Sequence, residues 1–157
     1  MTIEDYISRE LSGTDRRQTA LDFVRFLREK ELHFHRDTCD CWKDKIYYWV
    51  QRGDDCVCFI AIADPDEPAN RLTVWSDDMC LPQSEAAAVS DAVREAAWRY
   101  VDHCGHCGSC GGGRRKIIFG RTFEDVCGCT FRVDNPSPGD LPFLKEVVEL
   151  RLAEIAQ

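Results

Sequence analysis

Three short apolar runs in the first half of the chain have the composition and spacing of β-strands. They are KIYYWV at 45–50, CVCFIAIA at 56–63 and RLTVWS at 71–76, all rich in aromatic and β-branched residues. The middle run is apolar on both of its alternating faces, which is typical of a central strand covered on both sides. Because the connections at 51–54 and 64–70 are short, we expect an antiparallel meander.

Apolar residues three and four positions apart predict helices on either side of this meander. One stripe runs through 14–31, and a second, clearer one runs through 84–102 after a serine N-cap. A final helix begins at the S-P-G-D sequence of 137–140, where the serine and the aspartate form a capping box. We therefore expect an α+β fold, with one domain over 1–157 and a sheet packed by helices. Less regular stretches predict a short helix within 1–13, a loop at 31–42, and two short strands at 116–120 and 129–133 flanking a turn.

The segment 103–133 contains half of the ten cysteines of the chain. Three follow a C-x2-C-x2-C pattern and two form a C-x-C pair; they are Cys104, Cys107, Cys110, Cys127 and Cys129. A C-x2-C step lets two thiolates reach one metal ion, and a second pair completes the tetrahedral sulfur site that zinc accepts. Glycines between the cysteines allow sharp turns. The pattern predicts a C-terminal knuckle holding structural zinc, with Cys104 and Cys107 as one pair of ligands and Cys127 with either Cys129 or Cys110 as the second.

Other interpretations of these cysteines stay open. C-x2-C-x2-C also occurs in iron–sulfur proteins, with Cys127 or Cys129 as the remote ligand. Reduced cysteines acting as small core residues are a third possibility. Disulfides are disfavoured because the N-terminal stretch has no apolar signal sequence, so we expect a cytoplasmic protein with reduced thiols.

A second cluster of metal-ligand residue types lies at 33–41. It comprises His33, His35, Cys39 and Cys41. No C-x2-C step supports a metal site here. The alternative is that the two histidines point outward around Phe34 on a short extended segment, and this is the favoured interpretation.

The formal net charge of −8 would repel a phosphate backbone, so we expect no nucleic-acid binding. No apolar run approaches the ~18 residues of a membrane span, so no membrane partner is expected either. One local exception is basic: Arg114, Arg115, Lys116 and Arg121 occur with no acid between His103 and Arg121. These cations favour either an anion contact or, preferably, compensation for a thiolate metal centre.

The C-terminal third of the chain resembles a group of known proteins. CGHCGSC, then KIIFGRTFEDVCG, then NP before an amphipathic helix are similar to small bacterial proteins of unknown function with a C-terminal cysteine cluster. Such a resemblance implies a metal site and no activity.

Aromatic residues on the predicted strands suggest a binding site, for a small molecule or a protein partner. Tyr47, Trp49 and Trp75 alternate along their strands, so we expect their rings to line a cleft between the sheet and the helices, with acidic loops at 64–67 and 77–78 favouring a cationic or neutral ligand. We therefore expect a non-enzymatic, zinc-binding module. The alternative is a thiol-redox sensor that releases its metal on oxidation.

Overall fold

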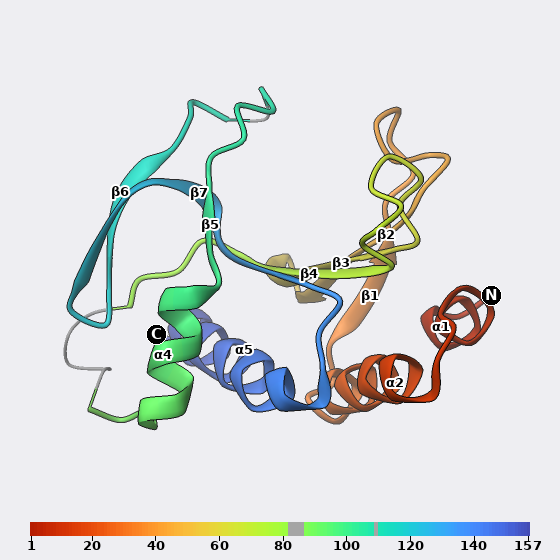
Figure 1. Cartoon of the computed structure of the whole chain (residues 1–157), viewed down its shortest axis with the longest axis horizontal. Coiled ribbons are helices and arrows are strands. Elements are labelled where there is room, and N and C mark those ends of the chain that lie inside the picture. The colour runs from red at the N-terminus through yellow and green to blue at the C-terminus, as the bar shows by residue number, and fades with distance from the viewer. Residues whose placement is uncertain (82–86, 109) are drawn as a thin grey trace.

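The computed structural model describes residues 1–81, 87–108 and 110–157. The fold is α+β, as predicted, with all named strand pairs antiparallel (Figure 1). The helices are α1 (Ile3–Glu10), α2 (Thr14–Glu29), α4 (Asp91–Arg99) and α5 (Leu141–Ile155), the last preceded by the 3-10 turn η1 (Pro138–Asp140). The strands are β1 (His33–Arg36), β2 (Ile46–Arg52), β3 (Asp55–Ile62), β4 (Leu72–Ser76), β5 (Val101–His103), β6 (Arg114–Ile118) and β7 (Arg121–Asp134).

These strands form one sheet in the order β1-β2-β3-β4-β7-β5, with β6 paired to the first half of β7. The predicted meander is β2-β3-β4, and each of its strands begins and ends within two residues of the predicted bounds. The long strand β7 joins two parts of the sheet, because its end pairs with β4 and its beginning pairs with β6. The cysteine segment thereby becomes an extension of the meander.

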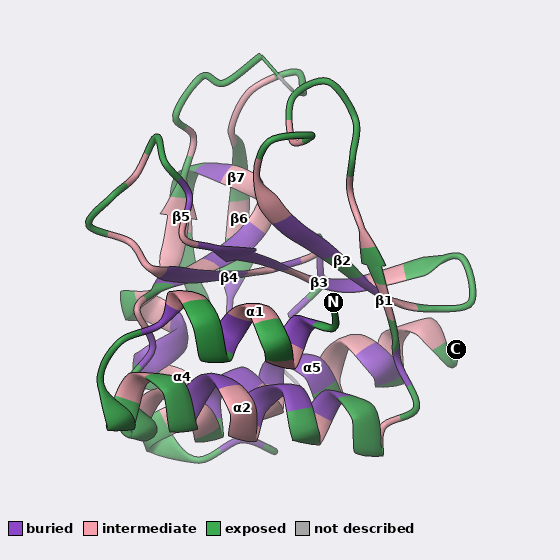
Figure 2. Ribbon diagram, turned by 90° about the vertical axis from the view of Figure 1, so that its right-hand side faces the viewer, coloured by how far each residue is buried: buried purple, intermediate pink, exposed green. Residues whose placement is uncertain are grey.

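The described helices lie on one face of the sheet (Figure 2). On β2 that face carries Tyr48 and Val50, whose partners on β3 are Ile60 and Cys58. The helices contribute the apolar stripes expected from their periodicity, including Phe23 and Leu27 on α2 and Leu144, Val148 and Leu152 on α5. The opposite face, called the outer face below, is covered by no described helix.

Two expected boundaries differ from the structure. The helix expected at 84–102 is α4, which begins after Ser90, whose Oγ accepts a hydrogen bond from the Val93 amide (3.2 Å). The expected cap Ser84 lies outside the described residues. Three residues of the expected helix, Val101–His103, are instead strand β5, because β7 offers them a sheet edge.

Two predicted irregular stretches are strands. Residues 33–36, expected as loop, pair with β2 as strand β1. The expected turn at 121–128 is the first half of β7, and the turn of this hairpin lies earlier, at Phe119 and Gly120, which both have positive φ angles (48° and 84°). Positive φ at both central residues is the requirement of a two-residue type I′ hairpin.

Candidate functional site

The three aromatic residues expected to form a binding site do share one face of the sheet. Trp49 pairs with Phe59, and Phe59 pairs with Trp75, so these side chains lie in one row across three strands. Tyr47 contacts the same row: its ring centroid is 6.1 Å from that of Phe59 and 6.0 Å from that of Trp75. The rings of Trp49 and Phe59 meet edge to face at 5.7 Å. Such tilted and offset contacts are the favourable geometries of aromatic pairs.

The location of this cluster corrects the expected cleft between sheet and helices. Tyr48, Val50 and Val74 occupy the positions that face the helices, so the alternating residues Tyr47, Trp49 and Trp75 face outward. The alternation could not decide between the two faces, because both are apolar in the strand sequences. The aromatic cluster therefore lies on the outer face.

Trp42 belongs to the same cluster, and the sequence analysis did not identify it. It lies in the 37–45 connection and stacks on Tyr47 with ring centroids 4.0 Å apart and planes 10° apart. Its position three residues before the aromatic strand was the available signal, but a turn residue has no periodicity to assign it to a face. Trp42 leaves Tyr47 only 9% exposed, whereas Trp49 is 37% exposed.

Acidic side chains surround the cluster. Trp49 donates its indole N–H to Asp37 (3.0 Å). Two cations lie over ring faces: Lys45 Nζ is 5.0 Å from the Trp42 ring, and the Arg132 guanidinium is 5.1 Å from the Trp75 ring. Both cations are also ion-paired. Lys45 pairs with Asp64 and Asp66, and Arg132 pairs with Glu67 and Asp134. Asp37 is the fifth carboxylate beside the cluster. Five carboxylates against two cations make this face acidic.

Tyr47 is the buried member of the aromatic cluster. Burial raises the pKa of Tyr47 most, and the neighbouring Cys129 and Cys56 raise it further. The phenol therefore stays protonated and remains a hydrogen-bond donor at neutral pH.

Cys127 and Cys129 lie in a wide bulge of β7. The β5 ladder pairs Val101 with Phe131 and His103 with Val126, so only Asp102 lies opposite residues 127–130. Ser76 Oγ holds this bulge to β4, donating to the Cys129 carbonyl and accepting from the Phe131 amide (3.1 Å). Cys127 and Cys129 are both half-buried on either side of Gly128, and burial together with the neighbouring Cys127 raises the pKa of Cys129.

The other three cysteines of the predicted zinc knuckle lie in the 104–113 connection. The Cys104 amide bonds the Asp125 carbonyl (2.8 Å), which places this residue beside the strand that carries Cys127. Cys107 and Cys110 are exposed. Within the described ranges, no three His, Cys, Asp or Glu side chains are grouped so that they could hold a metal ion. The structure therefore does not show the knuckle, and zinc stays a prediction.

The second group of candidate ligands lies on and after β1. His33 and His35 are exposed on β1, and Phe34 between them packs on Tyr48 (6.5 Å between centroids). Cys39 and Cys41 are exposed in the following turn. The outward alternation favoured from the sequence describes this segment.

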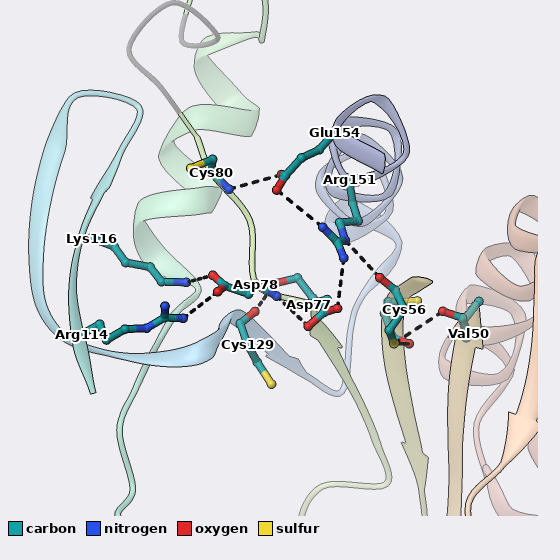
Figure 3. A network of polar contacts seen from close by, with 12 residues as sticks. Val50, Cys56, Asp77, Asp78, Cys80, Arg114, Lys116, Cys129, Arg151 and Glu154 are labelled. Carbon is teal, nitrogen blue, oxygen red and sulfur yellow. Dashed lines mark hydrogen bonds and ion pairs between the residues drawn. The ribbon is translucent and has the colours of Figure 1, made fainter. Parts of the chain in front are cut away.

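Three cations of the basic patch, Arg114, Arg115 and Lys116, line a groove of about 940 Å³ between β6, residues 78–81 and the end of α5. Figure 3 shows two of them, Arg114 and Lys116, directed at Asp78. Arg114 and Lys116 both bind the Asp78 carboxylate, at 2.7 and 2.6 Å. Burial would raise the pKa of Asp78, but the two cations outweigh this effect and lower the pKa. Arg115 pairs with Glu124, and Arg121 lies over Trp98 (5.2 Å). In the described part of the chain these cations thus contact carboxylates, rings and, for Lys116, the Thr130 hydroxyl, and Cys110 and Cys127 are near enough to Arg114 to affect its pKa.

The outer face offers stacking surfaces, one phenol donor and an excess of negative charge, an arrangement suited to binding. None of the helices in the described residues is long and apolar enough to cross a bilayer. Comparisons with protein-family models, with curated protein sequences and with solved structures found no match.

Proposed function

We propose that this protein is a small-molecule binding protein whose outer-face aromatic cluster takes an organic cation. The observation that carries the proposal is that three of the four tryptophans of the chain, Trp42, Trp49 and Trp75, lie in one cluster on a sheet face with no described helix over it. Aromatic side chains with a few polar groups between them are the usual lining of small-molecule sites.

The charge around the cluster favours a cation over an anion. Tryptophan faces attract cations with about 0.5–2 kcal/mol, depending on exposure. The five carboxylates and two cations of the surrounding side chains add a negative potential that concentrates cationic ligands. Lys45 and Arg132 already occupy two ring faces in this manner, which leaves the 37% exposed Trp49 as the ring open to a ligand.

Tryptophan fluorescence tests the proposal directly, because only one tryptophan lies elsewhere. Trp98 is on α4 and donates to the Ile118 carbonyl (2.8 Å), so a Trp98→Phe variant reports on the aromatic cluster alone. This variant is titrated with three probes of similar size: benzyltrimethylammonium, benzyl alcohol and phenylmethanesulfonate. We expect saturable quenching by the cation, weaker quenching by the alcohol and none by the anion.

Two further variants assign the site. Trp49→Ala should weaken cation binding about tenfold, since loss of one cation–π contact is worth about 1–2 kcal/mol when it is partly desolvated. Asp37→Asn should weaken it less and make it less sensitive to salt. Asp54→Asn, in the turn between β2 and β3, removes the same charge away from the cluster and should leave binding unchanged. Equal quenching by all three probes, or no binding by any, would exclude a cation site and favour a protein partner on this face.

A further inference from the structure

The chain contains three C-x-C pairs, which differ in burial and in the element that carries them. The pairs are Cys39 and Cys41, Cys56 and Cys58, and Cys127 and Cys129. The first is exposed in a turn, where the Cys39 backbone amide donates to the Asp37 carboxylate (2.9 Å). In the second, Cys58 is only 2% exposed in the core. In the third, both residues are half-buried and lie on either side of Gly128 in the bulge of β7.

Cys127 and Cys129 are two residues apart in one strand, a spacing near the upper limit of what a disulfide spans. Two residues of a strand advance about 6.6 Å, at about 3.3 Å each, which is near the upper end of the 4.4–6.8 Å between Cα atoms of disulfides. A bulge bends its strand. Gly128 between the two cysteines has no side chain to oppose that bend; a Cβ built there meets only one neighbour, an Arg114 side-chain nitrogen at 3.9 Å.

The bulge is also restrained on both sides of β7, which limits the movement of the backbone that carries Cys127 and Cys129. Ser76 bonds the Cys129 carbonyl and the Phe131 amide from β4. From the other side, Lys116 Nζ donates to the buried hydroxyl of Thr130 (2.5 Å). Thr130 itself has a φ of 68°, a left-handed conformation that fixes where the bulge ends.

We propose that Cys127 and Cys129 form a thiol–disulfide exchange centre that reacts with small disulfides such as oxidised glutathione. One cysteine thiolate attacks a glutathione sulfur, forms a mixed disulfide and releases one glutathione. The second cysteine thiolate attacks the protein sulfur of that mixed disulfide, forms the bond between residues 127 and 129 and releases the second glutathione. Two electrons pass from the cysteine pair to the oxidised glutathione, and the two thiol protons end on the two reduced glutathione molecules.

Trypsin places the three cysteine pairs in three different peptides, so the oxidation of one pair can be compared with that of the other two in the same sample. Cleavage after arginine and lysine places Cys127 and Cys129 alone in peptide 122–132 and Cys39 and Cys41 alone in peptide 37–43. Cys56 and Cys58 fall in peptide 53–71. Metal-free, reduced protein is equilibrated with mixtures of oxidised and reduced glutathione, acid-quenched, alkylated and digested, and each peptide is scored by mass spectrometry for its internal disulfide.

The exchange centre should oxidise first. We expect an equilibrium constant for disulfide formation at least about tenfold larger in peptide 122–132 than in peptide 37–43, while Cys58 keeps peptide 53–71 reduced. A Cys129→Ser variant should instead retain one glutathione on Cys127. In guanidinium chloride the advantage of 122–132 over 37–43 should disappear, because it comes from the fold.

Three results would overturn this inference. In the first, the 127/129 pair and the 39/41 pair oxidise to the same extent in the native protein. In the second, the 127/129 pair stays reduced while Cys39 and Cys41 oxidise. In the third, the larger equilibrium constant of peptide 122–132 persists in denaturant. The comparison between peptides uses the unmodified chain, so it holds even if the serine variant folds poorly.

Discussion

The backbone of Asp125 lies so close to Gly113 that only a glycine fits there. A Cβ placed on Gly113 would lie 2.8 Å from both the Cα and the carbonyl carbon of Asp125, closer than real Cβ atoms approach. Gly113 is the last residue before β6, and Asp125, with a φ of 56°, precedes Val126, the partner of Arg114 on β7. The contact fixes how the cysteine-bearing connection enters the hairpin.

Replacing this glycine should therefore displace β6 from β7. We expect Gly113→Ala to lower the free energy of unfolding by about 1–3 kcal/mol, the usual cost of overpacking against backbone. Gly111→Ala is the matched control, because a Cβ there meets nothing within 4 Å and should change stability by no more than about 0.5 kcal/mol. Urea unfolding curves of the two variants test this. Equal stabilities would show that a side chain fits at position 113 without displacing β6 from β7.

Arg151 is expected to be a main link between α5 and the sheet. Its Nε donates to the Cys56 carbonyl (3.0 Å) and its guanidinium pairs with Asp77 (3.3 Å), with the side chain only 15% exposed. Arg151→Met should cost about 1–3 kcal/mol, because two half-buried acceptors lose their donor. Arg115→Met removes an ion pair whose two side chains are 70% and 71% exposed, and it should cost no more than about 0.5 kcal/mol. Chemical unfolding of both variants decides; similar losses would contradict the role given to Arg151.

Features set by local sequence were predictable. The stripe on α2, the strands of the meander and the capping box between Ser137 and Asp140 all depend on residues near one another in the chain, and the structure confirms them. Tyr47, Trp49 and Trp75 were identified as neighbours because a strand alternates with period two.

Features set by distant residues were not predictable from periodicity. Val101–His103 continues a helical pattern but becomes strand because β7 pairs with it. β7 itself contains the charged stretch 121–128 that predicted a turn, and its bulge at 127–130 is held by Ser76, more than fifty residues earlier in the chain. The choice of which apolar sheet face receives the helices likewise depends on all the strands together.

The contact between Tyr100 and Asp140 predicts a pH dependence. Burial alone would raise the pKa of Asp140, but hydrogen bonds from the Tyr100 hydroxyl and from Ser137 outweigh it and lower the pKa. The unfolded chain, with a carboxyl pKa of about 3.9, therefore binds the proton first as the pH falls. The stabilisation is complete well above that value and is lost as acid lowers the pH through the folded pKa.

Removing the contact should flatten this dependence. Urea unfolding of the wild type, Tyr100→Phe and Asp140→Asn is measured between about pH 3 and pH 7. We expect both variants to be less stable than the wild type at neutral pH, by about 1 kcal/mol, and to converge with it in acid. Differences that stay constant over the whole range would contradict the role of the ionised carboxylate.

Zinc binding by the cysteine segment is tested by metal analysis of the protein as purified. We expect about one zinc per chain, held by four of Cys104, Cys107, Cys110, Cys127 and Cys129. The Cys104 amide already lies against β7 through the Asp125 carbonyl, so the 104–113 connection has to bring one more thiolate to the bulge. A chelator should then lower stability by several kcal/mol, because a metal bound only by the folded chain contributes to folding.

Single substitutions identify the zinc ligands. Cys104→Ser and Cys127→Ser should each lose the metal, whereas Cys56→Ser should retain it. Cys56 lies on β3, outside the 103–133 segment that carries the predicted ligands, so its replacement should act only as a core defect. Equal metal loss from all three variants would mean that the ligand set is wrong. Brown protein containing iron would replace zinc by an iron–sulfur cluster, and protein free of both metals would leave the thiols of 127 and 129 to disulfide exchange alone.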